Sequence, residues 1–337
     1  MTLPWHQGEF ASLLSRRDRL PHALLLLGPE GTGKLAFAEA LVRSLLCEAP
    51  GTSGLACGKC ASCGWLEQGG HPDFRRLEPE SLAESAEAEQ GGEKKKPSEQ
   101  IQVEQVRDIG SFVVMTSHRG GSKVVLIHPA ETLNASAANA LLKNLEEPPP
   151  LTQFILVSHR WHRLLPTIRS RCQDIALPPP DAATALTWLK TQDVRNPELA
   201  LAQAGGAPLL ALRFDDEYWR LRAVFFDAIA SRGFDPLHAT EALRECPPAL
   251  VVAWLQKWSF DLVSHRVTGR VRYNPDRAEA AATAAARIDG LQALRYHRQM
   301  VGLQRIVSHP LNARLFLEQL LLSYAMLLRG SVHMLAA

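Results

Sequence analysis

The sequence has no long apolar run, and this absence restricts where the protein can work. No segment reaches the ~18 to 20 consecutive uncharged apolar residues of a membrane span. The first residues, MTLPWHQGEF, also lack the basic-then-apolar order of a secretion signal. From these two absences we expect a cytoplasmic protein with no membrane segment.

The sequence also has little excess charge of either sign. Its 37 Lys and Arg residues and 35 Asp and Glu residues give a formal net charge of +2. A chain that alone gripped many phosphates of DNA would carry a stronger basic footprint. Any role on nucleic acid is therefore expected to be shared with partner chains.

The pattern of apolar residues predicts an α/β domain followed by helices. Apolar runs near residues 22–28, 123–127 and 153–159 are typical of buried strands, and stretches with helical spacing separate them. Strands that alternate with helices indicate a parallel sheet covered on both faces, here over residues 1–177. A run of three prolines, from Pro178 to Pro180, marks the end of this domain.

The rest of the chain has only helical spacing. We expect a small helical domain over residues 178–213 and an all-helical domain over residues 214–337. The larger domain is expected to bury two stripes, one with Trp254, Trp258 and Leu262 and one with Leu315, Leu320 and Tyr324. Residues 80–98 are charged and nearly free of large apolar side chains, so they cannot offset the entropy of ordering. They are predicted to form a mobile acidic insertion on the surface.

The segment GPEGTGK fits a phosphate-binding loop. Gly28, Gly31, Gly33 and Lys34 follow the G-x4-G-K pattern between a predicted strand and a predicted helix. The glycines let backbone N–H groups point at phosphates, the helix adds its positive end, and the lysine reaches the terminal phosphates. The pattern predicts that this segment descends from a nucleotide-binding loop. It leaves open whether the loop binds ATP or ADP.

The same loop lacks the oxygen ligands that a magnesium ion needs. The residue after the lysine is Leu35, where a Ser or Thr hydroxyl is expected, and the second strand ends in His128 and Pro129, where an acidic residue is expected. Glu131 is an alternative ligand, although a carboxylate at a helix start is commonly a partner of the helix dipole. Because two magnesium positions have lost their oxygens, we expect a P-loop domain that no longer hydrolyses ATP.

Four of the six cysteines crowd into residues 47–63, with the spacing C-x9-C-x2-C-x2-C. Four thiolates can close a tetrahedral zinc site, which leaves no open position for catalysis. In a reducing compartment this cluster favours structural Zn²⁺ over disulfides, with Cys47, Cys57, Cys60 and Cys63 as ligands. The isolated Cys172 and Cys246 are expected to be ordinary buried thiols, and His71, in HPD, is expected to form a turn.

Arg169 and Arg171 lie in TIRSRC, at the end of a predicted helix beyond the third strand. From periodicity alone both are solvated charges. The sequence as a whole, however, resembles the clamp-loader subunits of bacterial DNA polymerase III. The resemblance covers nearly the whole chain apart from the acidic insertion, and it depends on the four-cysteine segment and on GPEGTGK, HPDF, NALLKNLEEPP, LLPTIRSRC and NARLFLEQLLL.

This resemblance implies an AAA+ domain with a zinc module, a small helical lid domain and a helical collar domain through which a pentameric loader assembles. It also implies that Arg171, in the Ser-Arg-Cys motif, is an arginine finger that enters a neighbour's ATP site. In that site, a guanidinium can stabilise the negative charge that develops on the γ-phosphate during hydrolysis. The implied partners are the gamma or tau motor subunits and the delta subunit, with the sliding clamp and primer-template DNA contacted through the complex.

The sequence departs from the motor subunits of this family. Those subunits keep the Ser or Thr after the loop lysine, an Asp-Glu pair after the second strand and an arginine in the lid, where this chain has Pro208 and Leu209. The departures favour the stator type, a component of the polymerase holoenzyme (a DNA-directed nucleotidyltransferase) that itself has neither polymerase nor ATPase activity. The alternatives are an ATP-hydrolysing gamma- or tau-like subunit, a small-molecule phosphoryl-transfer enzyme and a zinc-stabilised interaction module.

Overall fold

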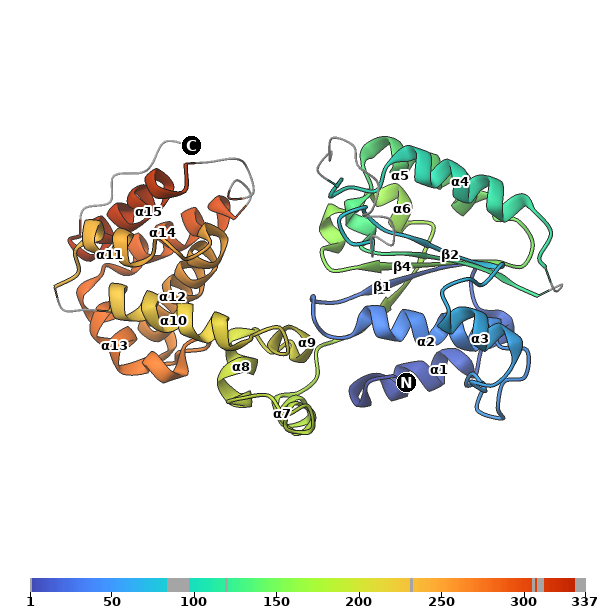
Figure 1. The fold of residues 1–337 in the computed structure, drawn as a ribbon, viewed down its shortest axis with the longest axis horizontal. Coiled ribbons are helices and arrows are strands. Elements are labelled where there is room, and N and C mark those ends of the chain that lie inside the picture. Colours follow the sequence, from blue (N-terminus) through green and yellow to red (C-terminus); the bar gives the residue numbers. More distant parts are fainter. Residues whose placement is uncertain are drawn as a thin grey trace. The chain divides into compact units, whose positions relative to one another are not determined.

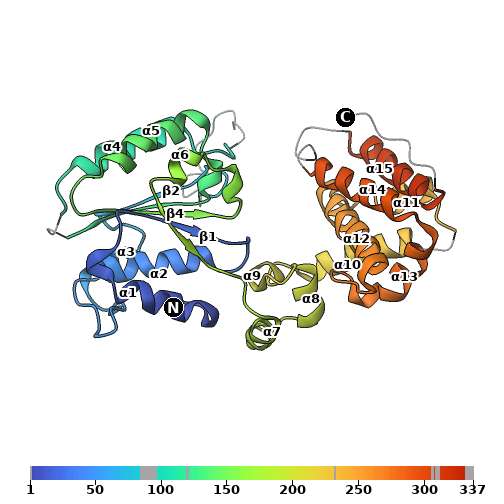
Figure 2. The same ribbon diagram turned by 180° about the vertical axis from the view of Figure 1, so that it is seen from behind.

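The structure, a computed structural model, describes residues 2–83, 97–118, 121–230, 233–304, 307 and 312–330. The chain divides into two compact units, residues 1–180 and 181–337 (Figures 1 and 2). In the described ranges, no helix has both the length and the apolar character needed to cross a membrane. Most of the predicted acidic insertion, residues 84–96, lies outside the described residues. Its two ends are joined, because Ser81 N donates to Ser98 O at 3.1 Å and Ser98 N donates to Glu80 Oε2 at 3.0 Å.

The first unit is built on a five-stranded sheet in which each neighbouring pair is parallel. The strands are β1 (Ala23–Leu27), β2 (Phe74–Leu77), β3 (Lys123–Ile127), β4 (Thr152–Ser158) and β5 (Gln173–Ala176), in the order β2-β3-β4-β1-β5. The predicted parallel α/β domain is therefore confirmed. Strand β2 was not expected, because it carries two exposed arginines at the edge of the sheet.

Helices cover both faces of this sheet, as Figure 1 shows. Along β1, Leu24 and Leu26 pack with α1 and α2, whereas Leu25 packs with α4 and α5 on the opposite face, because side chains of a strand alternate. Both layers are fully buried at the central strands, which explains their continuous apolar runs. The helices of this unit are α1 (Gln7–Leu14), α2 (Lys34–Leu46), α3 (Ala61–Glu67), α4 (Val103–Val114), α5 (Ala135–Glu146) and α6 (Pro166–Arg169).

The parallel sheet gives the unit two chemically different edges. The loop that contains Lys34 follows β1 at the carboxyl edge, and His128 and His159 follow β3 and β4 at the same edge. Arg171 precedes β5, whose first residue pairs with Leu24 near the start of β1. It therefore lies at the amino edge, and β1 alone separates the two edges by ~10 Å or more.

The second unit is helical, as predicted. A small apolar cluster holds α7 to α9 together, and a larger one, which includes Trp254, Trp258 and Leu262, lies among the remaining helices. Leu320 and Tyr324 are buried as expected, but the prediction for Leu315 is wrong because this side chain is 61% exposed. Leu320 lies five positions after it, which is ~140° of rotation around the helix. The helices are α7 (Ala182–Thr191), α8 (Pro197–Gln203), α9 (Pro208–Ala211), α10 (Asp216–Ile229), α11 (Pro236–Ala242), α12 (Pro248–Thr268), α13 (Ala278–Arg287), α14 (Gly290–Leu303) and α15 (Ala313–Leu328).

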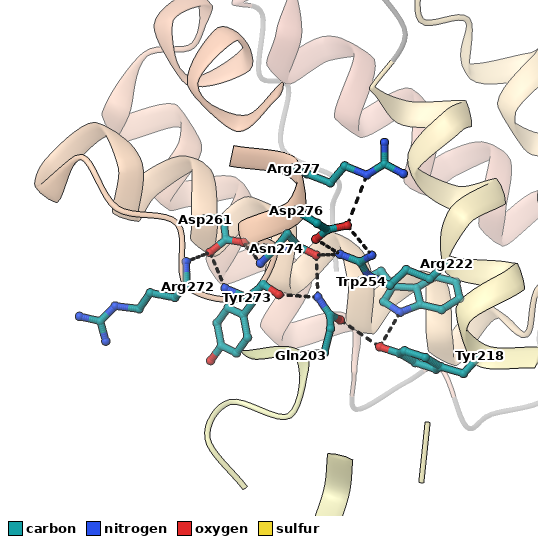
Figure 3. A network of polar contacts seen from close by, with 10 residues as sticks. All are labelled: Gln203, Tyr218, Arg222, Trp254, Asp261, Arg272, Tyr273, Asn274, Asp276 and Arg277. Carbon is teal, nitrogen blue, oxygen red and sulfur yellow. Dashed lines mark hydrogen bonds and ion pairs between the residues drawn. The ribbon is translucent and has the colours of Figure 1, made fainter. Parts of the chain in front are cut away.

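A buried polar network joins α8 to the larger helical part of this unit (Figure 3). Gln203 Nε2 donates to Tyr273 O at 2.6 Å and to Asn274 Oδ1 at 2.7 Å, and Gln203 Oε1 accepts from the Tyr218 hydroxyl at 2.9 Å. The fully buried Asp261 carboxylate accepts the backbone N–H groups of residues 272–274. Residues 178–213 thus pack with the helices that follow them, and the division into separate lid and collar domains stays a prediction.

Candidate functional site

The glycine loop after β1 has a conformation that requires its glycines. Gly31 and Gly33 have φ values of 74° and 99°, in the left-handed region that side chains disfavour. A Cβ atom at Gly28 would collide with the carbonyl oxygen of Leu177. Helix α2 begins at Lys34, immediately after the last glycine, so the backbone has the strand, turn and helix N-terminus of a phosphate-binding loop.

Groups of the chain itself hold the Lys34 ammonium. Its side chain is only 1% exposed, and Nζ donates to the carbonyl oxygen of Pro29 within the loop. Burial lowers the pKa of Lys34 to about 8, and the nearby carboxylates of Glu131 and Glu30 oppose that shift. The N-terminal segment also reaches the loop, because Trp5 Nε1 donates to Thr32 O at 2.9 Å, a contact that no sequence pattern indicated. Glu131 and Glu30 thus place negative charge near the ammonium that a phosphate would contact.

The carboxyl edge of the sheet offers nitrogen in place of the oxygens that magnesium prefers. His128 Nε2 and His159 Nε2 lie 3.1 Å apart, at the ends of β3 and β4. Burial, with positive charge from neighbours, lowers the pKa of His128 to about 4. Glu131 uses Oε1 to accept the backbone N–H of His159 at 2.9 Å. The described residues bring no group of three metal ligands together at this edge.

The four clustered cysteines converge as their spacing predicted. The Sγ atoms of Cys47, Cys57, Cys60 and Cys63 all lie within 4.8 Å of one another, at the end of α2 and the start of α3. Backbone N–H groups point at the sulfurs, with Cys57 N 3.2 Å from Cys47 Sγ and Cys60 N 3.4 Å from Cys57 Sγ. Such bonds stabilise thiolates, and four thiolates at this spacing need a cation between them. The donor set fits a metal such as zinc.

The pKa values within the cluster differ because burial and hydrogen bonds act to different extents on each thiol. Burial opposes ionisation of Cys60, yet bonds from the N–H groups of Cys63 and Glu48 lower its pKa to about 6. Burial and the hydrogen bond with Cys60 raise the pKa of Cys63 to about 12. Without a cation, the thiols thus cannot all ionise together near neutral pH. Burial raises the pKa of Cys172 to about 12 and also raises that of Cys246. Cys246 is buried as expected, whereas Cys172 is only partly buried.

A hydrogen-bonded chain beneath the cysteines was missed by sequence reasoning. His71 Nδ1 accepts the backbone N–H of Asp73 at 3.0 Å, which leaves Nε2–H to donate to Ser62 Oγ at 2.8 Å. The Ser62 hydroxyl then donates to Leu46 O at 2.6 Å. Leu46 and Ser62 each precede a cysteine of the cluster, so His71 connects both halves of the module. The predicted turn at His71 is present, but its wider role depends on tertiary contacts that spacing does not reveal.

Arg169 is the last residue of helix α6, and Arg171 lies two residues beyond it, at the amino edge of the sheet and away from Lys34. Arg171 Nη1 donates to Thr167 O at 2.9 Å, and Nη2 pairs with the Glu146 carboxylate at the end of α5. Arg169 donates from Nε and Nη2 to Asp174 Oδ2 at 2.9 and 2.7 Å. The Arg171 side chain is about one-third exposed, at 32%.

These features define a class of protein: a P-loop α/β domain that lacks the usual magnesium ligands, carries a four-cysteine cluster and continues into a helical unit. A family model described as "DNA polymerase III, delta subunit" matches residues 9–181. Subunit delta' of DNA polymerase III from Pseudomonas aeruginosa is 41% identical over 79% of this chain and 78% of its own length. The delta' subunit from Yersinia pestis is 34% identical over 81% of this chain and 80% of its own length.

The chain therefore belongs to the delta' family of DNA polymerase III clamp-loader subunits, which confirms the resemblance inferred from its motifs. Among solved structures, a gamma subunit-related protein of DNA polymerase III from Thermotoga maritima is 18% identical, with a TM-score of 0.47. That alignment covers 95% of this chain and 99% of the other.

Proposed function

We propose that this chain is a stator of the clamp loader, which lends Arg171 to the ATP site of a neighbouring motor subunit during loading of the sliding clamp onto primed DNA. One observation carries the proposal. Arg171 precedes β5 at the amino edge of the sheet, whereas the chain's own phosphate loop follows β1 at the carboxyl edge. An arginine so placed cannot reach phosphates in its own loop, so a phosphate that it contacts belongs to another chain.

The chemistry of the two edges supports this division of work. The chain's own loop has Leu35, His128 and Pro129 at the positions of magnesium ligands, so it is not equipped to stabilise the charge of a leaving phosphate. The Arg171 guanidinium, which is always charged, can donate a planar pair of N–H groups to phosphate oxygens. A nucleotide, ATP or ADP, would bind in the loop of Gly28, Gly31, Gly33 and Lys34. The ammonium of Lys34 has three N–H donors, and its bond to Pro29 O uses one of them.

The four cysteines give the AAA+ domain a structural Zn²⁺ site in this proposal. Cys47, Cys57, Cys60 and Cys63 would hold the ion, whose charge offsets that of the thiolates and whose filled coordination excludes a catalytic role. The proposed partners are gamma or tau motor subunits and the delta subunit, with the clamp and the primer-template contacted through the assembled complex. Residues 1–177, 178–213 and 214–337 correspond in this proposal to the AAA+, lid and collar domains.

Truncation of the finger tests the proposal in a reconstituted clamp loader. Arg171→Ala should lower turnover by ~10³-fold or more at the one ATP site that it serves. The total DNA-stimulated ATPase rate of the loader should therefore fall by the fraction that this one site contributes, while the mass of the complex is unchanged. The matched control is Arg163→Ala, which removes an exposed arginine eight residues earlier in the chain. Equal ATPase and equal clamp loading by wild type and Arg171→Ala would overturn the proposal.

A further inference from the structure

The proposed arginine finger, Arg171, directly follows a helix that is too short to be stable by itself. Helix α6 has four residues, Pro166–Arg169, and an isolated helix of one turn is not stable in water. Its inner side is anchored by Ile168, which is 1% exposed and packs into the core on the α4 and α5 face of the sheet. Leu164 and Leu165, just before the helix, pack against the same core. Apolar packing is non-directional, so a second, polar anchor is needed to fix the orientation of the helix.

Arg169 supplies that second anchor on the outer side. Its guanidinium donates from Nε and Nη2 to Asp174 Oδ2, at 2.9 and 2.7 Å, and thereby ties α6 to β5. The same guanidinium carbon lies 4.5 Å from the ring centroid of Trp161, in the 3-10 helix Trp161–Arg163 after β4. A planar guanidinium can make both contacts at once, one with its edge and one with its face. Arg169 therefore connects three elements around the finger.

Arg171 depends on the same short helix for its own placement. Its backbone N–H donates to Ile168 O at 3.1 Å, and its Nη1 donates to Thr167 O at 2.9 Å. Both acceptors belong to α6. The guanidinium also pairs with Glu146 at the end of α5, so its direction depends on how α6 is held relative to α5.

We propose that Arg169 is a positioning residue for Arg171: its contacts with Asp174 and Trp161 fix the direction of α6 and hence of the finger. The inference rests on the proposed function, since it concerns the aim of a guanidinium at a neighbour's phosphate. Catalytic groups lose effect steeply with distance, and a misplacement of ~1 Å can cost ~10²-fold in rate. The Arg169 and Asp174 side chains are 42% and 35% exposed, so their ion pair adds little to folding stability. Variants at either position are therefore expected to fold.

The experiment compares variants in a reconstituted loader, with kcat and KM for ATP measured separately. Arg169→Gln should lower kcat at the served site by ~10-fold, less than Arg171→Ala does, while KM, the mass of the complex and the melting temperature are unchanged. Asp174→Asn should act in the same direction. Arg169→Lys keeps the positive charge but loses the planar fork, so it should retain most of the defect. Arg163→Gln is the matched control and should behave as wild type.

A double variant separates positioning from a general structural effect. Arg169→Gln combined with Arg171→Ala should have the same kcat as Arg171→Ala alone. A positioning residue has no effect on kcat once the residue that it positions has been removed. Wild-type kcat for Arg169→Gln, alongside an impaired Arg171→Ala, would overturn this inference and leave the proposed function standing. A loss of assembly or a lower melting temperature that accounts for the whole defect would also overturn it. If Arg171→Ala itself keeps the wild-type rate, both proposals fall.

Discussion

His128 and His159 face each other across the carboxyl edge of the sheet, with their Nε2 atoms 3.1 Å apart. Only one proton fits between them, and burial, His159 and Arg76 together lower the pKa of His128 to about 4. Lys34 adds to this effect and Glu131 opposes it. A histidine in the unfolded chain titrates near pH ~6.5, so between that pH and about 4 the unfolded state binds more protons. The free energy of unfolding is therefore expected to fall as the pH drops through this range.

The variant His128→Gln tests this expectation, because glutamine can hydrogen-bond but does not titrate. Urea unfolding at pH 7.5 and pH 5 should show that wild type loses ~1 to 2 kcal/mol more than the variant, after allowance for partial exposure. His238→Gln, at an exposed histidine on α11, should reproduce the wild-type loss. Any effect of acid on bound metal is common to all three proteins. An equal loss in His128→Gln and wild type would contradict the expected role of the pair.

Metal analysis should find about one zinc per chain, because four thiolates complete one tetrahedral site. Cys60→Ser should release the ion and lower the melting temperature of the first unit, since the cluster ties the end of α2 to the start of α3. Zinc should also leave as the pH falls, because protonated thiols do not bind it. Cys246→Ser, at an isolated buried thiol in the second unit, should keep the zinc. A native preparation without zinc would exclude a structural metal.

The isolated chain should hydrolyse ATP no faster than its Lys34→Ala variant, because Leu35, His128 and Pro129 provide no oxygen ligand for magnesium. A coupled ATPase assay with and without magnesium checks this. The Lys34→Ala variant should also assemble into the loader with wild-type stoichiometry. Magnesium-dependent turnover that disappears in Lys34→Ala would instead support the gamma- or tau-like alternative.

Gln203 should stabilise the helical unit through the network in Figure 3. Gln203→Leu would leave Tyr273 O without the donor that it has at 2.6 Å and the Tyr218 O–H without its acceptor at 2.9 Å, while the bond from Trp254 Nε1 to the Tyr218 hydroxyl would remain. Groups left unsatisfied in this way cost ~1 to 3 kcal/mol, so the unfolding midpoint of the second unit should fall by a corresponding amount. Gln192→Leu, at an exposed position after α7, is the control. A midpoint that changes equally in both variants would argue against the network.

The sequence predicted those parts of the molecule that depend on local pattern. Apolar runs identified β1, β3 and β4, and regular spacing identified the loop glycines and the four cysteines. Strand β2 was missed because an edge strand that carries Arg75 and Arg76 lacks an apolar signature. The expected burial of Leu315 was wrong because a spacing of five positions places it ~140° from Leu320 around the helix, on another face.

The contacts that shape the site could not be read from spacing. Lys34 is held by Pro29 within its own loop, but Trp5 reaches that loop from the N-terminal segment. His71 and Ser62 meet only after the chain folds back on itself. The same holds for Arg169 and Trp161, whose contact depends on how the 3-10 helix after β4 packs against α6. Such pairings are set by tertiary structure, which leaves no periodic trace in one sequence.

The opposite placement of Arg171 and Lys34 has a geometric consequence for assembly. Under the proposed function, the chain would donate an arginine at one edge and could receive one only at the other. A twofold axis brings identical surfaces together, so it could not satisfy both edges. Such contacts would be head-to-tail, and head-to-tail contacts either close into a ring or continue as a helix. A member whose own loop does not hydrolyse ATP would need no incoming arginine and would suit the end of such a series.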